Sequence, residues 1–236
     1  MKWTSYGLSW EKTLPKKDKY EDEGTWIWLS MSCESRLLLA HCVGPRTQKT
    51  ANQLVAKTAR RLASIPLFVT DGLKFYKNDL LNQYYEVIKY PSTGKRGRPR
   101  SPRLIANALL KYGQIIKERS GSRLIKIVKK IVFGNDIDPK SISTSYIERQ
   151  NLTLRQDNNR ISRKTIGFSK KTEELDNQMT LYIAYYNFCR THRSLKYKED
   201  TGKTYYNCPA KHAGLIDRIW SLEHLLRFPY HKITTG

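Results

Sequence analysis

The sequence predicts one main α/β domain followed by a helical C-terminal tail. Two runs of β-forming residues within 25–43 are separated by four polar residues, which is typical of a β-hairpin. Residues 47–62 carry apolar side chains at helical spacing, and the short apolar run 65–69 indicates a buried strand. Because strands and a helix follow one another along the chain, we expect a mixed sheet flanked by helices.

The rest of the chain divides into a basic loop and a helical part. Residues 91–103 combine proline, glycine and basic residues, and we expect an exposed loop there. Residues 120–133 alternate apolar with basic residues, a pattern that fits a strand or a short basic helix. We expect a main domain over 1–172 and a helical segment over 173–236 that packs on it and ends in a short helix capped by Ser221.

Positive charge dominates the composition. The chain has 43 Lys and Arg against 21 Asp and Glu, which gives a net charge of +22. Such a field suits a polyanion, although the basic surface of a ribosomal or membrane-associated protein would look alike. The sequence has no apolar run long enough to span a membrane and no Cys-x-x-Cys pair, so we expect a soluble, intracellular protein without a zinc ribbon.

Within the basic loop, the segment 96–100 reads Arg-Gly-Arg-Pro-Arg. It resembles an AT-hook, an extended segment that lies in a narrow A·T minor groove. This interpretation makes Arg96, Arg98 and Arg100 candidate DNA-binding residues. A solvated basic linker is the alternative.

Two acidic residues are candidates for chemistry. Asp71 follows the predicted buried strand, where α/β sheets commonly hold ligands, but Thr70-Asp71-Gly72 is also a common turn signature. Glu148 lies near the start of a predicted helix, and Ser145-x-x-Glu148 equally fits a capping box. Two carboxylates brought together could hold the divalent metals that phosphoryl transfer on DNA requires.

Basic and amide side chains follow the second of these acids or lie on the basic segment 120–133 before it. Phosphate and base-edge donors follow Glu148 on the same helix, and further lysines precede it. The predicted DNA-binding residues outside the basic loop are Lys126, Lys130, Arg149, Asn151 and Arg155.

Several motifs stand in an order that resembles a known family. They read VGPRT at 43–47, VTDG at 69–72, TSYIERQNLTLR at 144–155 and YNFCRTH at 186–192. Together they resemble the prokaryotic insertion-sequence DDE transposases, in the branch whose last catalytic acid lies in a Glu-Arg-Gln-Asn-Leu motif.

The resemblance implies a fold, a reaction and partners. It implies an RNase H-like catalytic domain that depends on Mg²⁺ or Mn²⁺, with Asp71 as the second catalytic acid and Glu148 as the third. Both would be metal ligands and would serve DNA strand cleavage and strand transfer during transposition. The implied partners are double-stranded DNA, as element ends and target, and further copies of the chain in at least a dimer. No small-molecule substrate is implied, and the expected location is the prokaryotic cytoplasm, at the nucleoid.

One element of the family pattern is missing, because no acid precedes Glu11 in the sequence. The residues from Trp3 onward resemble those that follow the family's first Asp-Glu pair, so we expect that pair upstream of Met1. Asp18 and Asp22 are the nearest replacements. An inactive truncated transposase that only binds DNA or a partner is therefore the alternative function, and a basic structural or RNA-binding protein is a third.

Overall fold

The computed structural model describes most of the chain, with the backbone alone for β1. The described residues are 2–9, 25–90, 101–162, 166–167, 169–199 and 202–229. The strands are β1 (Lys2–Ser9), β2 (Trp26–Ser32), β3 (Leu38–Gly44), β4 (Leu67–Asp71), β5 (Tyr85–Ile88), β6 (Arg103–Ala106), β7 (Lys111–Ser120), β8 (Arg123–Phe133), β9 (Lys196–Lys198) and β10 (Thr204–Tyr206). The α-helices are α1 (Gln48–Ala59), α2 (Phe75–Gln83), α3 (Ser145–Asp157), α4 (Thr172–Phe188), α5 (Pro209–His212) and α6 (Leu222–Arg227).

A mixed sheet forms the centre of the described structure. Its six strands lie in the order β3-β2-β1-β4-β7-β8. The first three strands are antiparallel neighbours, β4 pairs in parallel with both β1 and β7, and β8 returns antiparallel to β7. The predicted α/β fold with a mixed sheet is therefore confirmed.

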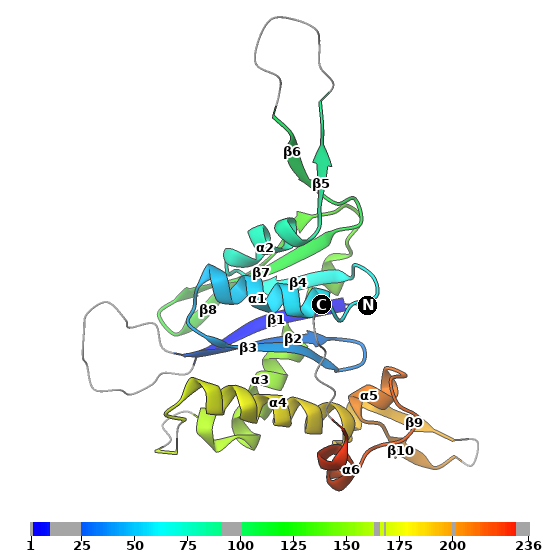
Figure 1. The fold of residues 1–236 in the computed structure, drawn as a ribbon. Coiled ribbons are helices and arrows are strands. Elements are labelled where there is room, and N and C mark those ends of the chain that lie inside the picture. Colours follow the sequence, from blue (N-terminus) through cyan, green and yellow to red (C-terminus); the bar gives the residue numbers. More distant parts are fainter. Residues whose placement is uncertain are drawn as a thin grey trace, which may run out of the picture.

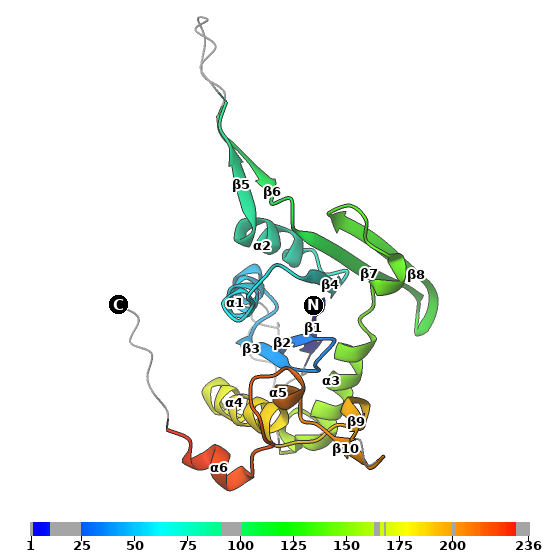
Figure 2. The same cartoon turned by 90° about the vertical axis from the view of Figure 1, so that its right-hand side faces the viewer.

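Helices cover both faces of this sheet (Figures 1 and 2). Side chains alternate between the faces along a strand, so Trp28 joins the core beneath α1 and α2 while Ile27 and Leu29 join the core beneath α3 and α4. Ile147 and Leu154 of α3 lie in that second core and are completely buried. The sheet is thus the middle of three layers.

The predicted secondary structure is confirmed for elements that bury one face. The hairpin within 25–43 is β2 with β3, and the helix within 47–62 is α1, whose N-cap Thr47 accepts a bond from the backbone of Thr50. The segment 120–133, left open between strand and helix, is the edge strand β8. Helix α2 and strand β7 were not predicted.

The part of the chain after residue 172 is more mixed than predicted. Helix α4 is confirmed, and Ser221 caps α6 by accepting a bond from the backbone of His224. A small hairpin of β9 and β10 lies between them, which the helical prediction lacked. Leu175 and Met179 of α4 share a core with β2, so α4 packs on the main sheet. The division between 172 and 173 remains a prediction.

The predicted basic loop begins on a two-stranded ribbon. Strands β5 and β6 form their own small sheet, which projects away from the three layers (Figures 1 and 2). Residues 91–100 lie outside the described residues, so the AT-hook interpretation and Arg96, Arg98 and Arg100 stay predictions.

One side chain of α4 satisfies the edge of the sheet at β3. The Asn187 amide oxygen accepts from the Leu38 backbone N–H at 3.0 Å, and the Asn187 amide nitrogen donates to the Leu38 carbonyl at 2.9 Å. Both residues are buried. Asn187 therefore pairs two backbone groups on the outer side of β3, where the sheet has no further strand among the described residues.

We expect Asn187→Leu to lower the free energy of unfolding by about 2–4 kcal/mol, because both backbone groups of Leu38 would stay buried without a partner. Urea unfolding followed by circular dichroism measures this. Thr180→Ala, an exposed position on the same helix, should change the free energy by less than about 0.5 kcal/mol. Equal stability of the two variants would show that Asn187 does not hold the edge.

Candidate functional site

Asp71 is the last residue of β4, in the centre of the sheet. In the parallel ladder it lies beside Ile115 of β7. Its Oδ1 accepts a hydrogen bond from the Leu73 backbone N–H at 3.2 Å, so the turn role considered for Thr70-Asp71-Gly72 is present. The same side chain lines a cavity of about 850 Å³ at this end of the sheet. Asp71 therefore both caps a turn and faces an open site.

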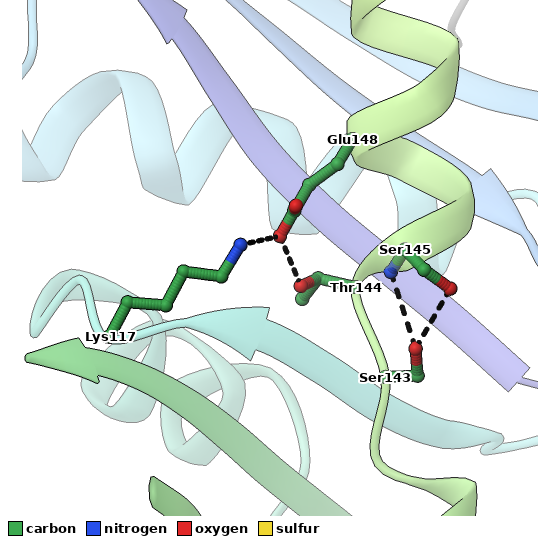
Figure 3. Close-up of polar contacts among 5 residues, drawn as sticks. All are labelled: Lys117, Ser143, Thr144, Ser145 and Glu148. Atoms are coloured by element: carbon green, nitrogen blue, oxygen red, sulfur yellow. Dashed lines mark hydrogen bonds and ion pairs between the residues drawn. The ribbon is translucent and has the colours of Figure 1, made fainter. Parts of the chain in front are cut away.

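Glu148 lines the same cavity from α3. Its Oε1 accepts from the Lys117 ammonium at 2.6 Å and from the Thr144 hydroxyl at 2.5 Å (Figure 3). The helix begins at Ser145 with Thr144 as its N-cap residue, so Ser145 is not the cap that the capping box required. Because these two side-chain groups hold the Glu148 carboxylate, the capping-box interpretation is wrong.

Close packing of the chain before α3 places this helix. Ile142 is completely buried among Val69, Ile115 and Ile137. It lies directly over Gly113 of β7, where an added Cβ would come within 2.8 Å of the Ile142 side chain. Glycine at 113 thus lets the segment leading into α3 approach the sheet closely.

The cavity is rich in positive charge. Five cationic side chains and two carboxylates line it. The cationic residues are Arg46, Lys74, Lys117, Arg119 and Arg155. A site of this composition attracts a polyanion while keeping two acidic groups for a cation.

Burial raises the pKa of Asp71 above its ordinary value of 3.8, and the nearby Glu148 carboxylate raises it further. The Leu73 backbone N–H and the positive charges of Arg46 and Lys117 act in the opposite direction. The influence of Glu148 on the Asp71 pKa means that the two acids, far apart in sequence, are electrostatic neighbours in the fold.

The predicted residues of α3 divide by face. Asn151 and Arg155 line the cavity with Glu148, whereas Arg149 is exposed and does not. Asn151 is 2% exposed, and neither its Oδ1 nor its Nδ2 has a hydrogen-bond partner.

The two predicted lysines of β8 lie on the other side of the sheet. Lys126 pairs with Glu118 and Lys130 pairs with Gln114, whereas Lys117 pairs with Ile127. Directly paired residues share a face and neighbours along a strand alternate, so Lys126 and Lys130 face away from Lys117. Their DNA contacts remain a prediction.

Sequence reasoning missed several residues of the cavity as site residues. Lys117, Arg119 and Thr144 received no role, and Arg46 was noted only within the motif VGPRT at 43–47. Arg46 follows β3, and its guanidinium lies 4.8 Å from the ring centre of Trp26. Only Thr144 could have been found from the sequence, because it directly precedes the helix of Glu148. Lys117 and Arg119 are placed by strand pairing, which the local sequence does not reveal.

The donor set fits a divalent cation in part. Asp71 and Glu148 offer hard carboxylate oxygens to one cavity, the ligand type that Mg²⁺ and Mn²⁺ prefer. Among the described residues, no group of three or more His, Cys, Asp or Glu side chains could hold a metal ion. β1, whose Ser5 pairs with Thr70 next to Asp71, has the sequence KWTSYGLS without an acid. Asp18 and Asp22 lie outside the described residues.

Within the described part of the chain, none of the helices has the length and apolar character needed to cross a membrane.

Comparison with known proteins gives one family similarity. The model of the IS1 transposase family matches residues 123–189, which run from β8 through α3 to the end of α4. The matched segment contains Glu148 and Asn151 but not Asp71. No curated protein and no solved structure matches the chain. The similarity to IS1 transposases supports an insertion-sequence transposase role.

Proposed function

We propose that this chain is the catalytic domain of an insertion-sequence DDE transposase that cuts and joins DNA with the help of Mg²⁺ or Mn²⁺. The observation that carries the proposal is the convergence of Asp71 and Glu148 in one cationic cavity. The family match over the helix of Glu148 supports it independently.

The sheet supports an RNase H-like fold as part of this proposal. Three antiparallel strands are joined through β1 to the parallel strands β4 and β7. Asp71 ends the central strand β4, and Glu148 lies on a helix that covers the same end of the sheet. Ligands commonly bind at the carboxyl ends of parallel strands.

The residues of the cavity have separate roles in this reaction. Asp71 and Glu148 would hold the metal, which when bound supplies an activated nucleophile and charge stabilisation at the leaving oxygen. Arg46, Lys117 and Arg119 would neutralise the DNA phosphates and orient the backbone. Lys117 also pairs with the Glu148 carboxylate, so it would have to exchange this partner for a phosphate in the proposed complex.

The partners follow from the same proposal. Double-stranded DNA, as element ends and as target, is the substrate, and joining two ends requires at least a dimer of the chain. Such a protein acts at the nucleoid in a prokaryotic cytoplasm.

We expect Mn²⁺-dependent nicking of supercoiled plasmid to fall by at least about 100-fold in Asp71→Asn and in Glu148→Gln, because each loses a metal-binding carboxylate. Gel electrophoresis of the plasmid measures nicking. Asp79→Asn and Glu118→Gln are matched controls, since both acids lie outside the cavity, and they should keep the activity. DNA binding without nicking in the unaltered chain would favour the inactive remnant instead.

The raised pKa of Asp71 predicts opposite effects of pH on metal binding and on stability. A metal ligand must be deprotonated, so Mn²⁺ affinity should fall with acidification at a higher pH than an exposed aspartate would give. In the metal-free chain at pH 7 the desolvated charge destabilises the folded state, so Asp71→Asn should raise Tm by on the order of 2 °C.

The stability difference should shrink once the pH falls below the raised pKa of folded Asp71 and vanish near the ordinary value of 3.8, where the unfolded carboxyl is protonated as well. Thermal unfolding in EDTA between pH 4 and 8 measures it. Asp136→Asn, at an exposed position, is the control and should leave Tm unchanged. A lower Tm for Asp71→Asn at pH 7 would contradict the prediction.

The two faces of the β7–β8 pair predict which lysine contacts DNA. Lys117→Met should weaken DNA binding and reduce the slope of log K against log salt by about 1, since one phosphate contact is lost. Lys126→Met, on the opposite face, tests the predicted DNA contact of Lys126: a reduced slope would support that contact, and an unchanged slope would restrict DNA to the cavity face. Fluorescence anisotropy of labelled duplex DNA over a salt series measures both. The reverse result would place DNA on the face of α1 and α2.

A further inference from the structure

Asn151 is a buried amide that the fold leaves without partners. Its side chain is 2% exposed, and both its Oδ1 and its Nδ2 lack hydrogen bonds. Leaving a buried polar group unpaired costs about 1–3 kcal/mol, and most buried side-chain polar atoms are paired. Asn187 illustrates the usual situation, because at 6% exposure both of its amide atoms bond to Leu38. The unpaired state of Asn151 therefore requires an explanation.

The position of Asn151 supplies one. It follows Glu148 by three residues on α3, which places the two side chains on neighbouring turns of one helical face. The buried side chains of Ile147 and Leu154 determine which face of α3 meets the sheet. Asn151, Glu148 and Asp71 consequently line the same cavity.

The chemistry of the cavity distinguishes the two ends of the amide. Five cationic side chains already offer donors for phosphate oxygens, so a further N–H would add little. Oxygen ligands are scarce, because the described residues hold no third acid beside Asp71 and Glu148. A side-chain carbonyl is an accepted ligand of hard divalent cations.

We propose that Asn151 Oδ1 is the third protein ligand of a divalent cation held together with Asp71 and Glu148. The inference rests on the proposed function and extends it. A neutral ligand completes the oxygen set without adding negative charge, so the cavity keeps the excess positive charge that attracts the DNA backbone.

The test is Mn²⁺ binding to the full chain without DNA, measured from the free Mn²⁺ signal in electron paramagnetic resonance. Asn151→Leu should weaken binding by about 10-fold or more, since it removes the oxygen ligand. Asn151→Asp keeps an oxygen at this place and should bind at least as tightly as the unaltered chain. Gln150→Leu is the matched control, because Gln150 is a buried amide of the same helix that bonds to the Tyr182 hydroxyl outside the cavity.

Thermal unfolding in EDTA separates a ligand from a structural residue. Because the Asn151 side chain makes no hydrogen bond in the fold, Asn151→Leu should not lower Tm in EDTA, whereas Mn²⁺ should raise the Tm of the unaltered chain and of Asn151→Asp more than that of Asn151→Leu. A Tm loss in EDTA without a change in Mn²⁺ affinity would overturn the inference.

The outcomes distinguish the inference from the function on which it rests. Mn²⁺ binding that Asp71→Asn abolishes but Asn151→Leu leaves intact would remove the role of Asn151 alone. Equal weakening in Asn151→Asp and Asn151→Leu would also overturn it, because the N–H rather than the oxygen would then matter. No Mn²⁺ binding by the unaltered chain would remove both proposals.

Discussion

The packing of α3 onto the sheet is the constraint on which the candidate site depends. Ile147 and Leu154 are completely buried against β2 and α4, and together they determine the rotation of the helix about its axis. With that rotation, Glu148 and Asn151 face the cavity and Arg149 faces solvent. A helix turned by one residue would bury a different set, so core packing and site geometry are determined by the same contacts.

The electrostatics of the cavity oppose the stability of the metal-free fold. Burial raises the pKa of Asp71 and the neighbouring Glu148 carboxylate raises it further, so two like charges lie near each other at the cavity. Lys117 relieves part of this repulsion by pairing with Glu148. A cation near both acids would reduce this repulsion, because it would favour the ionised form of both.

Sequence patterns predicted the elements that bury one face, and they predicted that Asp71 follows a buried strand. The hairpin of β2 and β3, helix α1 and the strand before Asp71 follow from apolar periodicity, which core packing imposes. Strand β8 stayed ambiguous because it lies at the sheet edge with most of its side chains exposed. The sequence did not single out Lys117, because only the register of β7 and β8 shows which lysines lie on the same face as Glu148. For the same reason, the sequence could not separate Lys126 and Lys130 from the predicted DNA-binding residues of α3.

The position of β8 at the edge of the sheet also bears on its basic residues. β8 is the outer strand of the sheet, and Ile125, Ile127 and Ile131 on it are between 44% and 64% exposed. An exposed apolar edge strand tends to pair with other chains, and lysines along it oppose such pairing by charge repulsion. Lys126 and Lys130 lie on this strand and away from the cavity. Strand pairing therefore separates the cations that line the cavity from Lys126 and Lys130, which lie along the sheet edge.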